Sequence, residues 1–405
     1  MSFRTIVLTE RRPRTCRLGP VDVQYLLVHH RSHLDLVPTD QRHVYRVTPL
    51  GHVGIIVTPR CRLVIQPKIP LQNLFLLLDP ALPLPAVSDC GTATEGNDVF
   101  DLLVSQYAHR LAKQTTAGLH RDYAQRAEQG PFLQGCLDVP AQLRENPTRK
   151  ELLHSRYQDF TADVPCNQVL KTIAEAVLNS GLAGAEVCAL LRQTLSSFDG
   201  VQTMAIDSRV FDRLGSERLP EGYRPLLDLC RLLAEGLGPN GSPGTRPAPA
   251  FLINLERAFE RHLTRGVVAA FAGRQHWTVA VQLYRIANQA AAGQPDLAMR
   301  PDLILERDGQ PLLIVDAKWK RLPSDSLVIE DVYQVLAYAT ALGASGAVLV
   351  YPGRRERVWD YVLVDSPVRL VVRTLSVSGT REQCARSLRR LGRWLWQRVS
   401  VSGGC

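Results

Sequence analysis

Residues 301–319 read PDLILERDGQPLLIVDAKW, and this stretch decides the fold of the C-terminal part of the chain. Two apolar runs flank an Asp-Gly pair, which is the strongest short-range signal for a β-hairpin. Side chains alternate across a strand, so Asp316 and Lys318 project to one face, and an antiparallel neighbour can place Asp302 beside them. The sequence therefore predicts two carboxylates and an ammonium group converging at one end of a hairpin.

These three side chains suit the hydrolysis of a phosphodiester. Mg²⁺ prefers carboxylate and water oxygens, Mn²⁺ suits the same ligands, and a lysine can orient or deprotonate the attacking water. An Asp-x-Lys pair also arises by chance as a surface ion pair. The buried run before it and the hairpin favour a site instead, because buried charge is costly unless it is paired or metal-bound. We expect Asp302 and Asp316 to hold Mg²⁺ beside Lys318, in the PD-(D/E)xK pattern of restriction-endonuclease-like nucleases.

The helices predicted on either side of these strands carry further candidates. Glu256 and Glu260 share a helix face at i,i+4, where like charges repel unless a cation lies nearby, and Glu260 is the candidate third acid. The alternative is an exposed acidic face balanced by neighbouring arginines. Gln334 and Tyr338, also at i,i+4, either orient Lys318 or a phosphate, or form ordinary polar surface.

The chain divides by pattern into four segments. Residues 1–95 contain short strands between Pro, Gly and Asp, which predicts a β-rich N-terminal domain, and residues 96–236 follow a helical period. Residues 237–250, LGPNGSPGTRPAPA, have the composition of a linker. Residues 251–405 then alternate helices and strands in the order of an α/β nuclease domain with a mixed sheet.

The first segment also holds the densest group of histidines. The run VQYLLVHH, residues 23–30, is expected to form a strand. A strand would turn His29 and His30 to opposite faces, so a metal site that includes His33 is disfavoured.

Composition narrows the class of partner. The 405 residues carry 48 Lys and Arg against 39 Asp and Glu, a net charge of +9 that favours an anionic partner such as nucleic acid. A basic protein without such a partner has the same balance. The C-terminal helix adds a basic face, for phosphate contact or for solvent.

The nine scattered cysteines form no CxxC pair, which disfavours zinc and iron–sulfur sites. We expect a cytoplasmic protein, because no membrane span or secretory signal is evident.

The chain resembles the McrC family, the nuclease subunits of the McrBC 5-methylcytosine restriction system. The resemblance rests on NLERAFERHL (254–263), PDLIL (301–305), LLIVDAKWK (312–320) and DVYQVLAYA (331–339), with weaker likeness in 53–69, 118–139 and 155–171. The family's helix motif usually shows Leu-Phe-Glu, whereas here Glu-Arg-Ala separates Leu255 from Phe259 and Glu260.

The resemblance implies a metal-dependent endonuclease that cuts double-stranded DNA at Asp302, Asp316, Lys318 and Glu260, and that is idle alone. The implied partner is an McrB-like AAA+ hexamer that hydrolyses GTP, with residues 1–95 docking to it and stimulating this hydrolysis. The sequence contains no GxxxxGK[ST] loop, so we expect the nucleotide to be bound by the partner. Two alternatives stay open: a self-sufficient RecB/Cas4-like DNA nuclease, and a non-catalytic DNA-binding adaptor.

Overall fold

The computed structural model describes residues 4–78, 98–146, 148, 151–238, 249–281, 284–285, 298–322 and 327–402. The chain forms two compact units: Met1–Val53, Thr58–Leu84 and Ile253–Cys405 make the first, and Gly54–Val57 and Pro85–Leu252 the second. The first unit is therefore built from both ends of the chain and the second from its middle. Residues 239–248 of the predicted linker lie outside the described residues.

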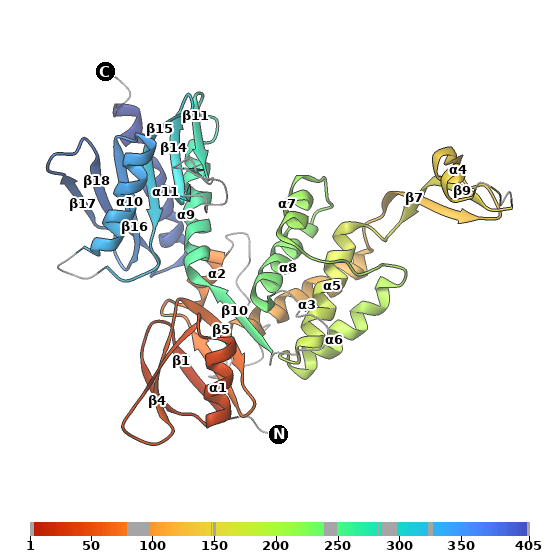
Figure 1. Cartoon of the computed structure of the whole chain (residues 1–405), viewed down its shortest axis with the longest axis horizontal. Helices are drawn as coiled ribbons and strands as arrows, with labels where there is room; N and C mark the ends of the chain where they lie inside the picture. Colours follow the sequence, from red (N-terminus) through yellow and green to blue (C-terminus); the bar gives the residue numbers. More distant parts are fainter. Residues whose placement is uncertain are drawn as a thin grey trace. The chain divides into compact units, whose positions relative to one another are not determined.

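A six-stranded mixed sheet lies at the centre of the C-terminal part, in the order β11-β14-β15-β16-β18-β17 (Figure 1). Strands β15, β16 and β18 run parallel, while β11 and β14 extend the sheet antiparallel at one edge and β17 at the other. The strands are β11 (Trp277–Ala280), β14 (Leu303–Arg307), β15 (Gln310–Ala317), β16 (Gly346–Gly353), β17 (Val358–Val362) and β18 (Arg369–Ser376). A separate short pair joins β12 (Tyr284–Arg285) to β13 (Ala298–Met299). The predicted α/β class with a mixed sheet is confirmed, although β17 was not anticipated.

The predicted hairpin joins β14 to β15. Asp308 and Gly309 have φ angles of 50° and 78°, the left-handed backbone that a tight two-residue hairpin turn requires. The antiparallel register pairs Leu303 with Val315. The next residues outward on the two strands are Asp302 and Asp316, so the turn and the register together place these carboxylates side by side.

Three helices cover the sheet. Helix α10 (Ile329–Leu342) packs Val335 and Ala339 into a core that includes Val372 of β18. The next side chain of β18, Arg373, points to the opposite face and stacks on Trp394 of α11 (Arg381–Ser402) at 4.7 Å. Helix α9 (Leu255–Phe271) packs against α11. The six-stranded sheet thus lies between α10 on one side and the α9–α11 pair on the other.

Helix α9 begins later than the sequence suggested. A helix was expected from residue 251, but Ala250–Asn254 form strand β10. The Asn254 side chain accepts hydrogen bonds from the backbone N–H groups of Glu256 and Arg257, at 2.9 and 3.1 Å. Asn254 is therefore the N-cap, and its capping bonds fix where the helix begins.

The N-terminal part is β-rich. It contains β1 (Arg4–Thr9), β2 (Arg14–Arg17), β3 (Leu34–Pro38), β4 (Val44–Pro49), β5 (His52–Val57) and β6 (Cys61–Gln66), and also α2 (Leu71–Leu78). The sheets are β2-β4-β3 and β1-β6-β5-β10. The chain passes between the two units inside the second sheet, at Val53–Gly54 and Leu252–Ile253.

The strand predicted at residues 23–30 was wrong. Helix α1 spans Pro20–His29, with proline at its first turn, where the fixed φ favours a helix and no N–H is missed. Asp22, 1% exposed, anchors this helix by accepting hydrogen bonds from Thr58 Oγ1 and Arg60 N at 2.7 and 3.0 Å. His29 and His30 are therefore not placed on opposite faces of a strand, as the sequence analysis expected.

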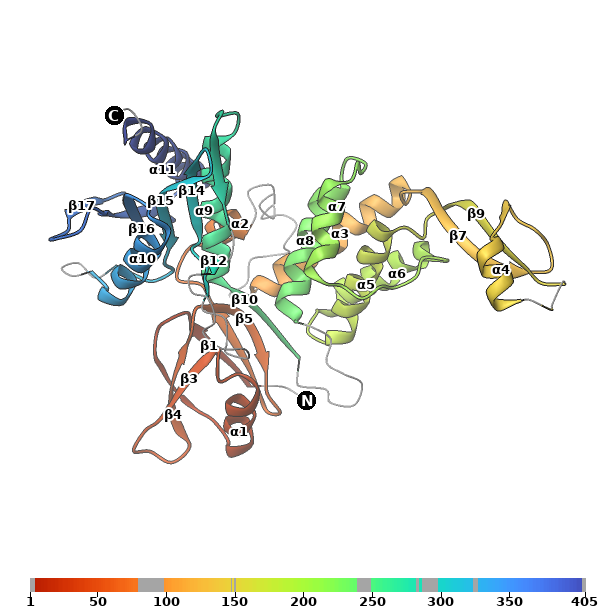
Figure 2. The same ribbon diagram turned by 45° about the horizontal axis from the view of Figure 1, so that its top comes forward.

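The middle unit is mainly helical. Its helices are α3 (Val99–Ala117), α4 (Val139–Glu145), α5 (Pro165–Ser180), α6 (Ala185–Leu195), α7 (Ser208–Ser216) and α8 (Tyr223–Leu237), with a short 3-10 turn at Ser196–Phe198. Its antiparallel sheet β7-β9-β8, formed by Asp122–Gly130, Leu153–Thr161 and Cys136–Leu137, was not predicted from the sequence. Within this unit, β7, β9 and α4 form an arm that extends away from the helices in both views (Figure 2). Among the described helices, none has the length and apolar character that a bilayer-spanning segment needs.

His262 makes the first unit sensitive to acid. It is 2% exposed in α9, and burial, reinforced by the charge of Arg265, lowers its pKa to about 3, from a usual value of 6.5. The pKa of His262 is lower in the folded state than in the unfolded state. The contribution of the neutral imidazole to stability is therefore fully present above pH 6.5 and is lost as pH falls toward 3. We expect the free energy of unfolding to fall by about 1.4 kcal/mol for each pH unit in this window.

Urea unfolding followed by tryptophan fluorescence measures this effect in the first unit alone, because all five tryptophans lie between residues 277 and 396. His262→Gln should flatten the pH dependence, whereas the matched substitution of the exposed His276 should not. An unchanged pH slope in the His262 variant would contradict the assignment.

Candidate active site

The β14–β15 hairpin brings Asp302, Asp316 and Lys318 together. Asp302 Oδ2 accepts a hydrogen bond of 2.7 Å from the backbone N–H of Ala317, which ties it to the end of β15. Lys318 Nζ lies 2.7 Å from Asp316 Oδ2, and the Asp316 side chain is 2% exposed. The convergence expected from hairpin geometry is present, with Lys318 facing the buried carboxylate.

Glu260 approaches the same group from α9. Burial raises its pKa, and the negative charges of Asp316 and Glu256 raise it further, while Lys318 acts in the opposite direction. Glu256, one turn earlier, forms an ion pair with Arg11, just beyond β1. The repulsion between the two glutamates is thus relieved by a cation from the N-terminal part, which the local sequence did not indicate.

The acids at this site outnumber the cations that face them. Burial, followed by the charges of Asp316 and Glu260, raises the pKa of Asp302 to about 7. Burial also raises the pKa of Asp316, although Lys318 opposes the shift. Burial would lower the pKa of Lys318, but its contact with Asp316 outweighs burial, and the pKa lies above its usual value. A further cation would relieve the repulsion among these carboxylates.

Two α10 side chains hold Lys318 from its other side. Lys318 Nζ donates a hydrogen bond of 2.7 Å to Gln334 Oε1, and Gln334 Nε2 donates one of 2.8 Å to the Tyr338 hydroxyl. Gln334 is exposed and Tyr338 half-buried, and Gln334 contacts Lys318 while Tyr338 contacts Gln334, as the orienting role requires. The hydrogen bonds from Lys318 to Gln334 and from Gln334 to Tyr338 fix the direction of the ammonium group.

A second polar group next to the site was missed from the sequence. Asp331, in the first turn of α10, lies 2.8 Å from Lys320 Nζ and accepts a hydrogen bond of 2.6 Å from the Tyr351 hydroxyl. Its charge contributes to the raised pKa of Asp316. The available signal was its spacing, because Asp331 precedes Gln334 by three residues and so lies on the same side of the helix.

Behind Lys318, the next residue along the chain reaches a buried carboxylate. Trp319 Nε1 donates a hydrogen bond of 2.8 Å to Glu10 Oε1, and Glu10 is fully buried. Arg11 and Lys68 each lie 3.5 Å from the same oxygen, and the Lys68 ammonium lies 4.7 Å from the centre of the Trp319 ring. The N-terminal strands therefore support the strand end that carries Lys318.

The donors at this site fit a hard divalent cation. Among the described residues, no set of three or more His, Cys, Asp or Glu side chains is arranged to hold a metal by itself. Mg²⁺ does not need such a set, because proteins commonly bind it through one or two carboxylates, with waters and substrate phosphates completing the shell. Asp302 and Asp316 supply two carboxylates with unbalanced charge, which suits Mg²⁺ or Mn²⁺.

Comparison with known proteins gives one family and one fold. The family model of the "McrBC 5-methylcytosine restriction system component" matches residues 47–352. A solved structure described as a half-complex of Thermococcus gammatolerans McrB AAA+ hexamers with bound McrC contains a chain with 16% identity and a TM-score of 0.55, covering 95% of this chain and 98% of that one. At that identity the likeness shows the fold alone.

A second structure, the T. gammatolerans McrBC complex, has a chain with 19% identity and a TM-score of 0.44, covering 67% of this chain and 89% of that one. That TM-score is too low to carry an argument. No functionally curated protein matches the chain.

Proposed function

The chain belongs to the McrBC 5-methylcytosine restriction system family, and from this premise we propose that it is the nuclease subunit of such a system. On this proposal the C-terminal part is a PD-(D/E)xK domain that cuts double-stranded DNA with Asp302, Asp316, Lys318 and Glu260. The observation that carries the proposal is the buried Asp316–Lys318 pair, with Asp302 beside it at the end of the hairpin.

The residues divide the hydrolysis of the phosphodiester among them. Asp302 and Asp316 would hold Mg²⁺, which would supply positive charge to offset the negative charge that develops on the phosphate oxygens. Lys318, held between Asp316 and Gln334, donates to the phosphate and orients the water. Glu260 accepts the proton of that water as the new oxygen–phosphorus bond forms. The bond to the leaving sugar oxygen breaks, and that oxygen takes a proton from solvent.

We also propose that an McrB-like AAA+ hexamer recognises the modified site and hydrolyses GTP. The T. gammatolerans half-complex pairs McrB hexamers with McrC, and the present chain has no phosphate-binding loop of its own. The test is DNA cleavage with Mg²⁺, on methylated and unmethylated DNA, with and without such a partner and GTP. Cleavage only in the full mixture is expected, whereas cutting by the chain alone would favour the self-sufficient nuclease.

Two exposed apolar surfaces are candidates for docking to the partner. In the predicted docking segment, α1 exposes Leu27 and Val28, the latter by 68%. In the middle unit, Phe132, just after β7, is 79% exposed, and Leu143 of α4 is also exposed. Exposed apolar surface on a folded chain marks protein–protein contacts. We propose that both surfaces contact the partner.

Val28→Asp and Phe132→Asp should therefore each reduce the stimulation of GTP hydrolysis by at least about tenfold, as expected for a charge placed in an apolar interface. The measurement is GTP turnover by the partner as the chain is titrated. Exposed Val364, on the loop between β17 and β18, offers a matched control for the same substitution. If a variant retains full stimulation, the surface that carries its substitution does not contact the partner.

Gln334→Leu tests the orientation of Lys318. Leucine keeps the volume but removes the acceptor for Lys318 Nζ and the donor to Tyr338. We expect the cleavage rate of the full mixture to fall by about 10- to 100-fold, as for loss of one positioning hydrogen bond. Tyr338→Phe, which leaves the Lys318–Gln334 bond intact, should have a smaller effect. Equal rates in wild type and Gln334→Leu would exclude the positioning role.

A further inference from the structure

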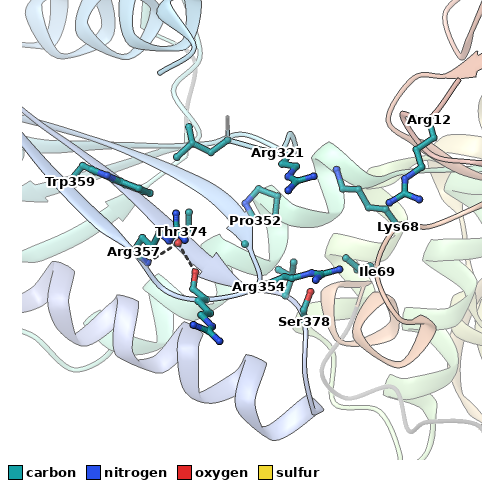
Figure 3. A pocket seen from close by; sticks show the side chains of 14 residues that line it. Arg12, Lys68, Ile69, Arg321, Pro352, Arg354, Arg357, Trp359, Thr374 and Ser378 are labelled. Atoms are coloured by element: carbon teal, nitrogen blue, oxygen red, sulfur yellow. Dashed lines mark hydrogen bonds between the residues drawn. The ribbon is translucent and has the colours of Figure 1, made fainter. Parts of the chain in front are cut away.

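A wide cavity of about 940 Å³ opens in the first unit, beyond the candidate active site. The cavity is lined by the end of β16, the loop to β17, parts of β17 and β18, the segments that follow β15 and β18, and N-terminal residues that follow β1 and β6 (Figure 3). Its lining includes six cations and no acid among the residues described: Arg12, Lys68, Arg321, Arg354, Arg355 and Arg357. None of these cations was predicted as a site residue, because they come from four separate stretches of the chain.

The arginines of this pocket are not neutralised by nearby acids. Within the described part of the chain, no carboxylate lies within ion-pair distance of Arg321, Arg354 or Arg355. Glu356, which lies between two of the pocket arginines in sequence, instead faces Arg373 and Arg390 at 3.7 and 3.6 Å. Figure 3 shows Arg321 and Arg354 on the same side of the pocket as Arg12 and Lys68, whereas Arg357 lies on the other side, near Trp359. Like charges repel, so such a cluster indicates an anionic ligand.

The loop that carries three of these arginines is held in place. Thr374 Oγ1 donates a hydrogen bond to the carbonyl oxygen of Arg355 and accepts one from the backbone N–H of Arg357, both of 2.7 Å (Figure 3). At Gly353 a Cβ would meet Thr374 Cβ at 3.0 Å, so glycine eases the close approach of the loop to β18. The backbone that carries these arginines is therefore ordered before a ligand arrives, which lowers the entropic cost of binding.

The pocket adjoins the candidate active site. Arg321 follows Lys318 by three residues, so their Cα atoms are at most about 11 Å apart, a span of only a few phosphates along one DNA strand. Lys68 contacts the ring of Trp319, the residue after Lys318. On the far side of the pocket lies Trp359 (Figure 3), which packs against the core that α10 covers.

We propose that this pocket binds the sugar–phosphate backbone of the DNA strand that is cut, a few nucleotides from the scissile phosphate. The spread of six cations over a volume this large fits a run of regularly spaced phosphates better than one small anion. This proposal rests on the proposed nuclease function, because DNA is the anion that the neighbouring site would act on.

The test measures DNA binding by the full chain without divalent metal, using fluorescence anisotropy of a labelled duplex at several salt concentrations. Arg354→Ala combined with Arg355→Ala should weaken binding about 10- to 100-fold and reduce the slope of log K against log salt by about 2. The matched control is Arg386→Ala combined with Arg389→Ala, two exposed positions on the basic face of α11. Unchanged affinity and slope in the pocket variant would overturn the proposal, as would a larger loss in the α11 variant.

Two further measurements separate this proposal from the nuclease assignment. Saturating DNA should restore cleavage by the pocket variant, whereas Asp316→Asn should bind DNA and fail to cut it. If Asp316→Asn cuts normally, the assignment of the nuclease site is wrong. The binding measurement still shows whether the pocket binds DNA. Millimolar inorganic pyrophosphate should compete only weakly with DNA; full displacement at a low concentration would identify a small-anion site and overturn the backbone assignment.

Discussion

Asp316→Asn should reduce DNA cleavage by the full mixture at least about 10³-fold, while DNA binding and GTP hydrolysis by the partner are retained. The substitution keeps the size of a side chain that is 2% exposed, but it removes the charge that faces Lys318 at 2.7 Å. It also removes one of the two carboxylates proposed to hold Mg²⁺. Single-turnover cleavage rates measure the loss of the chemical step directly.

The same hairpin provides the control for this substitution. Asp308 lies in the exposed turn, away from the site, with a φ of 50° that asparagine also tolerates. Asp308→Asn should therefore cut at the wild-type rate. Lys318→Met should share the defect of Asp316→Asn, because the donor to the phosphate is lost. Wild-type cleavage by Asp316→Asn would remove the catalytic assignment.

Glu10→Ala should destabilise the first unit by about 3 kcal/mol, because it leaves the buried Trp319 N–H and the Lys68 ammonium without this acceptor and removes one of the two carboxylates that face Arg11. Glu10 is fully buried, and one of its oxygens receives the Trp319 N–H at 2.8 Å and faces Lys68 and Arg11 at 3.5 Å. Urea unfolding followed by tryptophan fluorescence measures the loss, and Trp319 itself reports on the site of the change.

Two variants define what Glu10 contributes. Glu10→Gln keeps an acceptor for Trp319 but removes the charge between Lys68 and Arg11, so we expect a smaller loss than with alanine. Glu382→Ala, at an α11 position whose side chain is 75% exposed, should change the unfolding midpoint little. An alanine variant of Glu10 as stable as wild type would show that the buried network is not a source of stability.

The parts of the fold that could be predicted from sequence are those with a local cause. The Asp-Gly turn and the alternating strands around it depend on residues 301–319 alone, and these were sufficient to bring Asp302 and Asp316 together. Gln334 and Tyr338 were likewise accessible, because helix periodicity relates residues one turn apart.

The rest could not be predicted because its partners lie far apart in the chain. Glu10 and Trp319 are separated by 309 positions and Arg11 and Glu256 by 245, and no periodic pattern connects residues over such distances. The basic pocket could not be predicted for the same reason, because its arginines and lysine come from separate stretches of the chain. Helix α1 was missed for a different reason: its apolar run fits both a strand and a buried helix, and only Pro20 at its start favoured the latter.

The division of the first unit between the two ends of the chain has a consequence for biosynthesis. A ribosome completes residues 54–252 before it begins the long C-terminal portion that carries the hairpin, α9 and α10. Domains generally fold as units during synthesis, so the middle unit can fold while Glu10 and the strands around it still wait for Trp319. A nascent chain therefore cannot assemble the group of Asp302, Asp316 and Lys318 with its supporting residues until translation is nearly finished. On the proposed nuclease function, this order delays DNA cleavage inside the cell that makes the protein.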